Sequence, residues 1–415
     1  ASTRMNKAPH LIIVGGGAAG MAAAIAAAEE TTALSVTVYE PNNVLGRKLR
    51  ITGKGRCNVT NDCSPAEVLE NVTKNRKFLT GPIYRYTPAD VMSFFEENGV
   101  PLKTERGNRV FPESDKAGDV VDALVRTAKD AGVRFVTDDI TELIIENGVV
   151  KGVKSLKDSY FADKVVVATG GKSYPKTGST GDGYEFARQA GHNVTEILPS
   201  LCPVVTEEKE PAEMMGLSLR NCTLSLYEQG KAKPIFSELV EMLFTHFGLS
   251  GPLVLSASAH MDKIQTGRYE LSIDLKPALS YEKLDERILR DFGEFPNRDF
   301  SNALTKLLPS KMIDTIVKMS GIPAYKKVNQ ITREEREGLL KLLKDLRFRV
   351  KSLRPIDEAI ITRGGVDIKE IAPKTMESKL VQGLYFIGEV LDLDGYTGGY
   401  NLQIAFATAY AMANG

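Results

Sequence analysis

The sequence is poor in cysteine, carries no net charge and contains no long apolar run. Its four cysteines form no CxxC pair and are too sparse for a disulfide framework; they are Cys57, Cys63, Cys202 and Cys222. We therefore expect free thiols and a reducing, cytoplasmic compartment. Because Lys and Arg together number 53 and Asp and Glu also number 53, no global field attracts nucleic acid or an anionic membrane.

No apolar segment approaches the roughly 20 residues that span a bilayer. The N-terminus also lacks a basic segment followed by an apolar signal core. Residues 1–4 precede Met5, so we expect them to be an expression remnant and Met5 to be the natural start. At 415 residues the chain exceeds the usual size of one domain. The composition predicts a soluble protein of two or three domains, with a small-molecule substrate and no membrane partner.

The most informative stretch is HLIIVGGGAAG, at residues 10–20. The apolar run predicts a buried parallel strand, the glycines a tight turn, and residues 21–30 an alanine-rich helix. Gly15 permits the turn, Gly17 lets the backbone approach a pyrophosphate, and Gly20 lets the helix pack against the strand. Free N–H groups at the helix N-terminus then bind the anion. The alternative is an ordinary glycine turn in an α/β sheet.

A second predicted strand, 35–39, ends in Glu40, which is placed to accept hydrogen bonds from a ribose 2′-hydroxyl. An acid at this position disfavours a 2′-phosphate, so FAD or NAD fits better than NADP. A GxGxxG pattern alone is weak, but a strand before it and a helix and acid after it favour dinucleotide binding. The predicted cofactor-binding residues of this region are Gly15, Gly17, Ala18, Ala19, Gly20 and Glu40.

Residues 44–61 contain five cations and three glycines with little periodicity, as is typical of a functional loop. The cations suit an adenylate phosphate, a substrate carboxylate or an anionic reduced cofactor. We predict that Arg47, Lys48 and Gly53 bind the cofactor and that Lys54 and Arg56 are catalytic. The alternatives are a solvated basic loop and an interdomain structural role.

Cys57 lies in the same basic stretch, and a cationic setting lowers the pKa of a thiol. A redox role is therefore one hypothesis for Cys57. Because the sequence offers no CxxC partner, a packed small residue is the preferred interpretation.

Amphipathic helices and short strands follow this loop. Helices are predicted at 65–71, 88–98, 118–131 and 182–191, and strands at 134–137, 140–146, 149–156 and 160–161, with Asn147-Gly148 as a hairpin turn. A buried strand at 164–167 then leads to Gly170 and Gly171, which suit backbone approach to the same ligand.

The pattern of the central part of the chain indicates an inserted domain. Strands are predicted within 224–227, 239–244 and 269–275, and helices within 281–292, 302–320 and 333–348. We therefore predict a cofactor domain formed by 1–198 with 355–415, interrupted by a substrate or cap domain at 199–354. Residues 330–354 are locally basic, which is typical of a solvated helix face; a nucleic-acid contact is the alternative.

The C-terminal segment returns to the first domain. A third apolar strand, 384–389, ends in Gly388 and Glu389, and a glycine-rich loop leads into a helix at 402–412. The N-terminus of this helix can point N–H groups at the negative charge that develops on the N1–C2=O edge of a reduced isoalloxazine. Glu389 is placed to accept a ribityl hydroxyl. The predicted cofactor-binding residues are Gly170, Gly171, Gly388, Glu389, Gly399, Asn401 and Leu402.

Five ordered motifs together resemble the YhiN/BaiN-type flavoproteins, bacterial NAD(P)/FAD-dependent oxidoreductases that include the aminoacetone oxidase group. The motifs are GGGAAG at 15–20 with Glu40, TGKGRCN at 52–58, ATGG at 168–171, THFGLSGP at 245–252, and GE at 388–389 through GGYNLQ at 398–403. The resemblance covers nearly the whole chain.

This resemblance implies an α/β fold: a glutathione-reductase-like FAD-binding Rossmann domain with an inserted domain that is β-barrel-like and then helical. It also implies noncovalent FAD held by Gly15, Gly17, Ala18, Gly20, Glu40, Gly170, Gly388 and Asn401. Function within the family is heterogeneous, so the cofactor is better defined than the substrate.

Three functional hypotheses follow. In the first, FAD accepts a hydride from NAD(P)H or a small organic substrate and passes electrons to a second substrate or O2; with one GxGxxG, any NAD(P)H docks transiently. In the second, a flavin-dependent enzyme modifies RNA through the basic 333–354 segment. In the third, FAD is structural and the inserted domain is a binding module. His246 is a candidate acid/base, with a supporting role in its loop as the alternative. No metal site is predicted.

Overall fold

The computed structural model describes residues 9–30, 34–173 and 180–415. The expected expression remnant and Met5 lie outside the described residues. The chain forms two compact units: unit 1 is Ala1–Ser200 with Ile356–Gly415, and unit 2 is Leu201–Pro355. The sequence-based limits, 198/199 and 354/355, lie beside these limits, and the assignment of a cofactor domain and a substrate domain stays a prediction.

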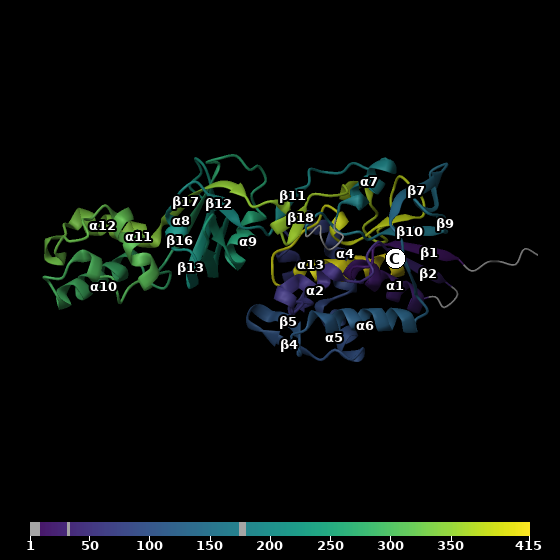
Figure 1. Cartoon of the computed structure of the whole chain (residues 1–415), viewed down its shortest axis with the longest axis horizontal. Helices are drawn as coiled ribbons and strands as arrows, with labels where there is room; N and C mark the ends of the chain where they lie inside the picture. Colours follow the sequence, from purple (N-terminus) through teal and green to yellow (C-terminus); the bar gives the residue numbers. More distant parts are fainter. Residues whose placement is uncertain (1–8, 31–33, 174–179) are drawn as a thin grey trace, which may run out of the picture. The chain divides into compact units, whose positions relative to one another are not determined.

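Unit 1 is built on a five-stranded parallel sheet of order β19-β10-β1-β2-β6. The strands are β1 (His10–Val14), β2 (Ser35–Glu40), β6 (Arg134–Thr137), β10 (Lys164–Val167) and β19 (Leu384–Phe386). The apolar side chains of β1 are buried, as expected for a central strand covered on both faces. The alanine-rich helices α1 (Ala18–Glu30) and α13 (Tyr400–Asn414) pack against each other in this unit (Figure 1).

The register aligns the carboxyl ends of these strands at one edge of the sheet. Val14 lies opposite both Tyr39 and Val167. Past these residues the backbone bonds continue, since Gly15 N–H donates to the Tyr39 carbonyl at 2.9 Å and Ile387 N–H donates to the Val167 carbonyl at 3.1 Å. Ligands of open parallel sheets bind at this edge, so the turns after β1, β2, β10 and β19 form the candidate site.

Smaller elements surround the sheet of unit 1. They are α2 (Arg47–Ile51), η1 (Thr52–Gly55), β3 (Thr60–Asn61), α3 (Pro65–Glu70), η2 (Arg76–Leu79), α4 (Thr80–Arg85), α5 (Pro88–Glu97), β4 (Leu102–Glu105), η3 (Arg106–Asn108), β5 (Arg109–Pro112), α6 (Ala117–Asp130), β7 (Ile140–Glu146), β8 (Val149–Ser155), β9 (Ser159–Phe161), α7 (Asp182–Gln189), β11 (Leu198–Ser200), η7 (Ile356–Glu358), β18 (Ile361–Arg363), η8 (Ile368–Glu370) and η9 (Gly388–Val390). Asn147 and Gly148 both have positive φ, so the predicted tight hairpin between β7 and β8 is confirmed.

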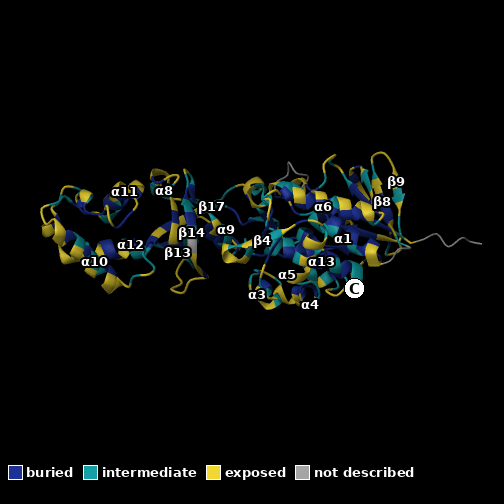
Figure 2. Ribbon diagram, turned by 90° about the horizontal axis from the view of Figure 1, so that it is seen from below, coloured by how far each residue is buried: buried dark blue, intermediate teal, exposed yellow. Residues whose placement is uncertain are grey.

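Unit 2 contains a closed six-stranded barrel of order β12-β15-β14-β13-β16-β17. Its elements are β12 (Val204–Thr206), α8 (Glu210–Glu213), β13 (Ser218–Glu228), β14 (Phe236–Phe244), β15 (Gly248–Ser250), α9 (Pro252–Ser258), β16 (Tyr269–Asp274), α10 (Tyr281–Glu294), η5 (Phe300–Asn302), α11 (Ser310–Ser320), η6 (Val328–Gln330), α12 (Arg333–Lys344) and β17 (Leu346–Leu353). The predicted fold class, a Rossmann domain with a barrel-like and then helical insertion, is confirmed. In Figure 2 α1 and α13 lie among buried residues, whereas α10 carries many exposed ones.

Three local predictions were wrong. The helix expected at 302–320 begins at Ser310, because Pro309 disfavours helical backbone at the residue before it. The helix expected at 333–348 ends at Lys344; Leu346, Phe348 and Val350 are buried in alternation and belong to a strand. Residues 44–61, expected to be a plain loop, contain the short helical segments α2 and η1.

None of the helices formed by the described residues combines the length and apolarity required to cross a membrane. All four cysteines are free.

Candidate functional site

Glycine occurs at three positions of the first turn for different structural reasons. Gly15 has φ +116°, and a Cβ there would lie 2.2 Å from the Ala168 carbonyl oxygen. A Cβ on Gly20 would lie 1.9 Å from the Gly15 carbonyl oxygen. The chain itself therefore requires glycine at both positions. A Cβ on Gly17 would meet nothing within 4 Å, so Gly17 leaves open space at the N-terminus of α1.

The open space beside Gly17 is where the fit of a dinucleotide can be examined. A pyrophosphate beside Gly17 would occupy the room that a side chain would fill, next to the N–H groups of the first turn of α1, which include those of Ala18 and Ala19. A second observation lies at the end of β10, where the Thr169 hydroxyl is buried and has no hydrogen-bond partner among the described residues. Both features fit a polar ligand at the carboxyl edge of the sheet.

Glu40 is tied to the same turn. Its carboxylate accepts a hydrogen bond from the Gly16 N–H at 2.7 Å and another from the Asn42 side-chain amide at 2.8 Å. Arg47, at the start of α2, donates to the Asn42 side-chain oxygen at 2.9 Å. The structure thus links the predicted residues Glu40 and Arg47 through Asn42, which the sequence analysis did not single out.

Lys48, Gly171 and Glu389 come together from distant parts of the chain. The Lys48 ammonium lies 2.5 Å from a carboxylate oxygen of Glu389, and the two side chains are only 22% and 17% exposed. A Cβ on Gly171 would lie 2.8 Å from the Glu389 carboxyl group, so this glycine makes room for the carboxylate.

Two further residues complete this cluster and were missed by the sequence analysis. The Thr362 N–H donates to Glu389 at 2.5 Å, and the Ser173 hydroxyl accepts a hydrogen bond from Lys48 at 2.9 Å. Their positions offered a weak signal, because Ser173 follows the Gly170-Gly171 turn and Thr362 precedes another glycine pair. The cluster is a half-buried charged site at the ends of β10 and β19.

Of the other predicted glycines, Gly388 and Gly399 are required by close packing and Gly170 by its backbone conformation. Gly388 has φ +74°, and a Cβ there would lie 3.0 Å from the Cβ of Ala19. Gly170 also has positive φ, at 74°. Gly399 caps α13 with φ +95°, and a Cβ there would lie 2.3 Å from the Thr60 carbonyl oxygen. Gly388 thus places the turn after β19 against the N-terminus of α1, and Gly399 places the N-terminus of α13 against β3.

Asn401 and Leu402 lie in the first turn of α13. The Asn401 amide accepts from the Gly395 N–H at 2.8 Å and donates to the Gly395 carbonyl at 2.9 Å. Its side chain therefore closes the loop before α13, and Leu402 is half-buried. Their predicted contact with the cofactor stays a prediction.

The basic turn after α2 has left-handed φ and ψ at Gly53, where glycine accepts them freely, and at Lys54, where they are costly. Lys54 is exposed and makes no hydrogen bond or ion pair with the residues that the structure describes. Left-handed backbone at a non-glycine residue is costly and recurs at functional sites. Lys54 is therefore the cation of this turn that is available to a ligand.

The Arg56 guanidinium, in contrast, is already paired with side chains of the protein itself. It donates to Asp115 at 2.8 Å, pairs with Glu105, and lies 4.0 Å from the centre of the Phe111 ring. The hydrogen bond from Arg56 lowers the pKa of Glu105, and hydrogen bonds from Lys103 and then Arg56 lower the pKa of Asp115. Arg56 thus anchors the turn, which favours the structural alternative over a catalytic role.

Cys57 is fully buried, and burial raises the pKa of its thiol to about 12. The thiol is therefore protonated at neutral pH and is not a nucleophile. Both features favour a packed small residue over a redox thiol.

His246 belongs to unit 2. It is exposed in the turn between β14 and β15, and its ring meets Phe247 edge-on at 5.1 Å between centroids. Thr245 closes this turn, because its N–H donates to the Gly248 carbonyl and its hydroxyl accepts from the Gly248 N–H. The structure thus leaves the His246 imidazole accessible in its own unit.

The basic 333–354 segment, also in unit 2, forms α12 and β17. Much of its charge is neutralised locally: Arg336 bonds to Asp285 at 2.7 Å, Lys344 to Asp274 at 3.0 Å, and Arg347 to Glu270 at 3.0 Å. A nucleic-acid surface needs unpaired cations. The segment does not favour the RNA-modifying hypothesis that was based on it.

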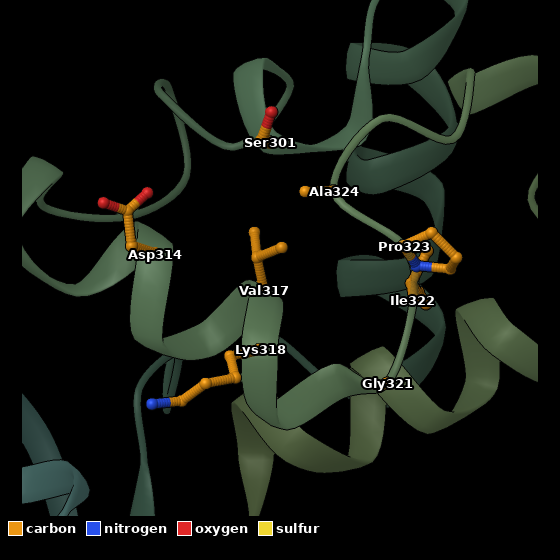
Figure 3. Close-up of a pocket in the computed structure, with 8 residues that line it drawn as sticks. All are labelled: Ser301, Asp314, Val317, Lys318, Gly321, Ile322, Pro323 and Ala324. Carbon is orange, nitrogen blue, oxygen red and sulfur yellow. The ribbon is translucent and has the colours of Figure 1, made fainter.

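Unit 2 also has a hollow of about 460 Å³ beside α11 (Figure 3). Its lining is Ser301, Asp314, Val317, Lys318, Gly321, Ile322, Pro323 and Ala324. The Lys318 ammonium pairs with Glu213. The hollow contains none of the predicted site residues.

Comparison with known proteins gives concordant matches. The sequence matches the HI0933-like protein Rossmann domain family over residues 9–415. It is 32% identical over 386 residues to a ribosomal RNA dihydrouridine synthase of Haemophilus influenzae, covering 91% of this chain and 92% of that protein. It is 29% identical over 380 residues to a 3-dehydro-bile acid delta(4,6)-reductase of Clostridium scindens, covering 90% and 91%.

A solved structure agrees in fold. The 3-ketosteroid delta1-dehydrogenase of Sterolibacterium denitrificans aligns with a TM-score of 0.51 and 14% identity, covering 97% of this chain and 98% of that chain. The family match spans every described residue, and the predicted resemblance to YhiN/BaiN-type proteins is confirmed. The chain therefore belongs to the HI0933-like family and is an FAD-dependent oxidoreductase with a Rossmann-type FAD-binding domain.

Proposed function

We propose that this protein is a reductase that saturates a ring carbon–carbon double bond conjugated to a carbonyl group. The observation that carries this proposal is similarity over nine-tenths of the chain to two proteins whose names describe such reactions. One forms dihydrouridine, in which the double bond next to the uracil carbonyl is reduced, and the other reduces the delta(4,6) bonds of a 3-dehydro bile acid. The shared chemistry is addition of a hydride and a proton across an electron-poor double bond.

In this proposal the carboxyl edge of the unit 1 sheet holds FAD. The open space at Gly17 takes the pyrophosphate, and Glu40 takes the adenosine ribose. The Lys48–Glu389 cluster takes the polar chain that joins pyrophosphate and ring. Bound there, FAD supplies hydride chemistry, whereas the protein supplies binding, orientation and charge.

The N-terminus of α13 supports the flavin ring. Its orientation is fixed by Gly399 against Thr60 and by the buried Gln403 amide, which accepts from the Thr60 hydroxyl at 2.6 Å. Partial positive charge at a helix N-terminus stabilises a negative charge placed beside it. We assign this role to the first turn of α13.

Lys54 is proposed to act on the substrate in unit 1. Its ammonium is unengaged on a turn with left-handed backbone, and we assign it to the carbonyl oxygen or another anionic group of the substrate. For His246 the proposal is limited to unit 2, where the exposed imidazole is a candidate proton donor. Because the chain has one strand-bound GxGxxG, a reduced nicotinamide donor docks transiently.

The substrate is tested with two acceptors. Purified protein with bound FAD and NADPH or NADH is incubated with a cyclic 4,6-dienone, and separately with ribosomal RNA, and products are identified by mass spectrometry. Saturation of either acceptor supports the proposal, and the acceptor consumed identifies the substrate class. If both double bonds stay intact while the nicotinamide is oxidised by O2, the oxidase alternative replaces the reductase. Lys54→Met should raise KM more than tenfold with little change in FAD content.

A further inference from the structure

A second group of ionisable side chains lies buried in unit 1 beside the loop that precedes α13. Asp394 is fully buried. One of its carboxylate oxygens accepts a hydrogen bond from the Ser200 hydroxyl at 3.2 Å, and the other is buried with no partner among the described residues. The Thr73 hydroxyl bonds to the Asp394 main-chain carbonyl at 3.1 Å. The carboxylate is therefore held by weak, neutral donors.

The charged groups that face Asp394 act in opposite directions. Arg363 is 5% exposed and favours the ionised carboxylate, whereas Asp392, also buried, opposes it. Asp392 itself pairs with Lys74 at 2.9 Å. Burial raises the pKa of Tyr184, and the nearby carboxylates of Glu389 and Asp392 raise it further. Desolvation is the largest influence and raises the pKa of Asp394 to about 6, whereas the Thr73 hydroxyl, the charge of Arg363 and the Ser200 hydroxyl act to lower it. Asp394 therefore changes its protonation state close to neutral pH.

The position of Asp394 connects this group to the cofactor loop. The same chain segment carries Glu389 before it and Gly399 after it, and Asn401 closes the loop on Gly395. The Thr73 N–H donates to the Asp394 carbonyl at 2.9 Å, which fixes the loop against the segment before η2. The residue that follows Asp394 is therefore hydrogen-bonded to the first turn of α13, the turn that the proposed function assigns to the flavin ring.

We propose that Asp394 is a proton-binding group linked to the redox state of the cofactor, which takes up a proton when the cofactor is reduced and releases it on reoxidation. This inference rests on the proposed FAD site at this edge of the sheet. Hydride transfer from a reduced nicotinamide brings two electrons and one proton, so the cofactor gains one negative charge. The added charge favours neutral Asp394, whose proton comes from solvent and converts the carboxylate to a carboxylic acid.

The experiment measures proton uptake when the FAD-loaded protein is reduced by NADH or, if that fails, photochemically under anaerobic conditions, with a pH indicator. The wild-type protein should take up more protons than Asp394→Asn, with the difference largest near pH 6 to 7 and absent below pH 4 and above pH 9. Asp139→Asn is the control, because desolvation also raises the pKa of Asp139, whereas this residue is exposed and lies outside the loop. It should behave as wild type.

A second variant tests the same idea without removing the carboxyl group. Ser200→Ala removes the hydroxyl that favours the ionised form, so the excess uptake should move to higher pH. Equal uptake by wild type and Asp394→Asn at every pH would overturn the inference, and so would an unshifted profile for Ser200→Ala. A protein that binds no FAD would contradict the proposed site as well, whereas normal reduction without excess uptake contradicts only the role of Asp394.

Discussion

At the scale of single residues, the glycines of the first turn separate the needs of the fold from those of the ligand. Gly15 and Gly20 cannot carry a Cβ without meeting main-chain oxygens, whereas Gly17 faces open space. Replacement of Gly17 by Val should therefore leave the fold intact and weaken FAD binding at least tenfold, about 1.4 kcal/mol. Flavin absorbance per protein measures the loss, and circular dichroism checks folding.

Gly338→Val is the control for that substitution, since a Cβ at Gly338 in α12 also meets nothing within 4 Å. It should keep full flavin content. Normal FAD retention by Gly17→Val would contradict the assigned pyrophosphate site.

The Lys48–Glu389 pair gives a second prediction. Both side chains are mostly buried, so removing one partner leaves the other charge poorly solvated. Lys48→Met and Glu389→Gln should each lower the unfolding free energy of the FAD-free protein by about 2 kcal/mol. Because the residues are in contact, the double variant should lose less than the sum. Additive losses in urea unfolding would show that the pair contributes no coupling.

Asp394 makes stability depend on pH. Its pKa is about 6 in the folded state against an ordinary value of 3.8, so the folded protein binds more protons between these values. The contribution of this group is greatest below pH 4 and is lost as the pH rises to about 6. The Asp394→Asn variant has no carboxyl group to titrate at this position, so it does not lose this stability as the pH rises. The variant's stability relative to wild type should rise by on the order of 2 kcal/mol between pH 4 and pH 7, and a constant difference in urea unfolding would contradict this.

At the scale of elements, the N-terminus of α13 is set by backbone contact. Gly399→Ala places a Cβ 2.3 Å from the Thr60 carbonyl oxygen at φ +95°, which should cost roughly 3 kcal/mol and displace the first turn of the helix. We expect lower melting temperature and weaker FAD binding. Gly321→Ala, with φ +72° and no nearby atoms at the end of α11, should cost only about 1 kcal/mol and retain FAD. Equal effects would refute this role for Gly399.

Elements differ in how far the sequence determines them. The turn at Gly15 to Gly20 was predictable because strand, glycine spacing, helix and Glu40 are local signals. The contact between Lys48 and Glu389 was not, since these residues are separated by 341 positions and meet only through the order of the strands. The same holds for Arg56. Its ion-pair partners come from β4 and from the segment after β5, so the run of basic residues around it could not predict these pairs.

At the scale of the whole molecule, the chain combines a parallel-sheet unit with a unit of barrel and helices. The FAD-binding family explains unit 1, whereas the substrate assignment relies on names of relatives that share about a third of the residues or fewer. Local charge pairing in α12 and β17 argues against that segment as an RNA surface. Because the two relatives are named for these two kinds of acceptor, RNA and a small cyclic enone are the substrates to compare.

The most direct measurement is an anaerobic visible spectrum of the FAD-loaded protein during sequential addition of a reduced nicotinamide and an acceptor. The account predicts that the flavin band bleaches with NADH or NADPH and returns when a conjugated cyclic enone or ribosomal RNA is added. A protein that shows no flavin band after reconstitution with FAD, or whose reduced band is restored only by O2, would contradict an FAD-dependent double-bond reductase.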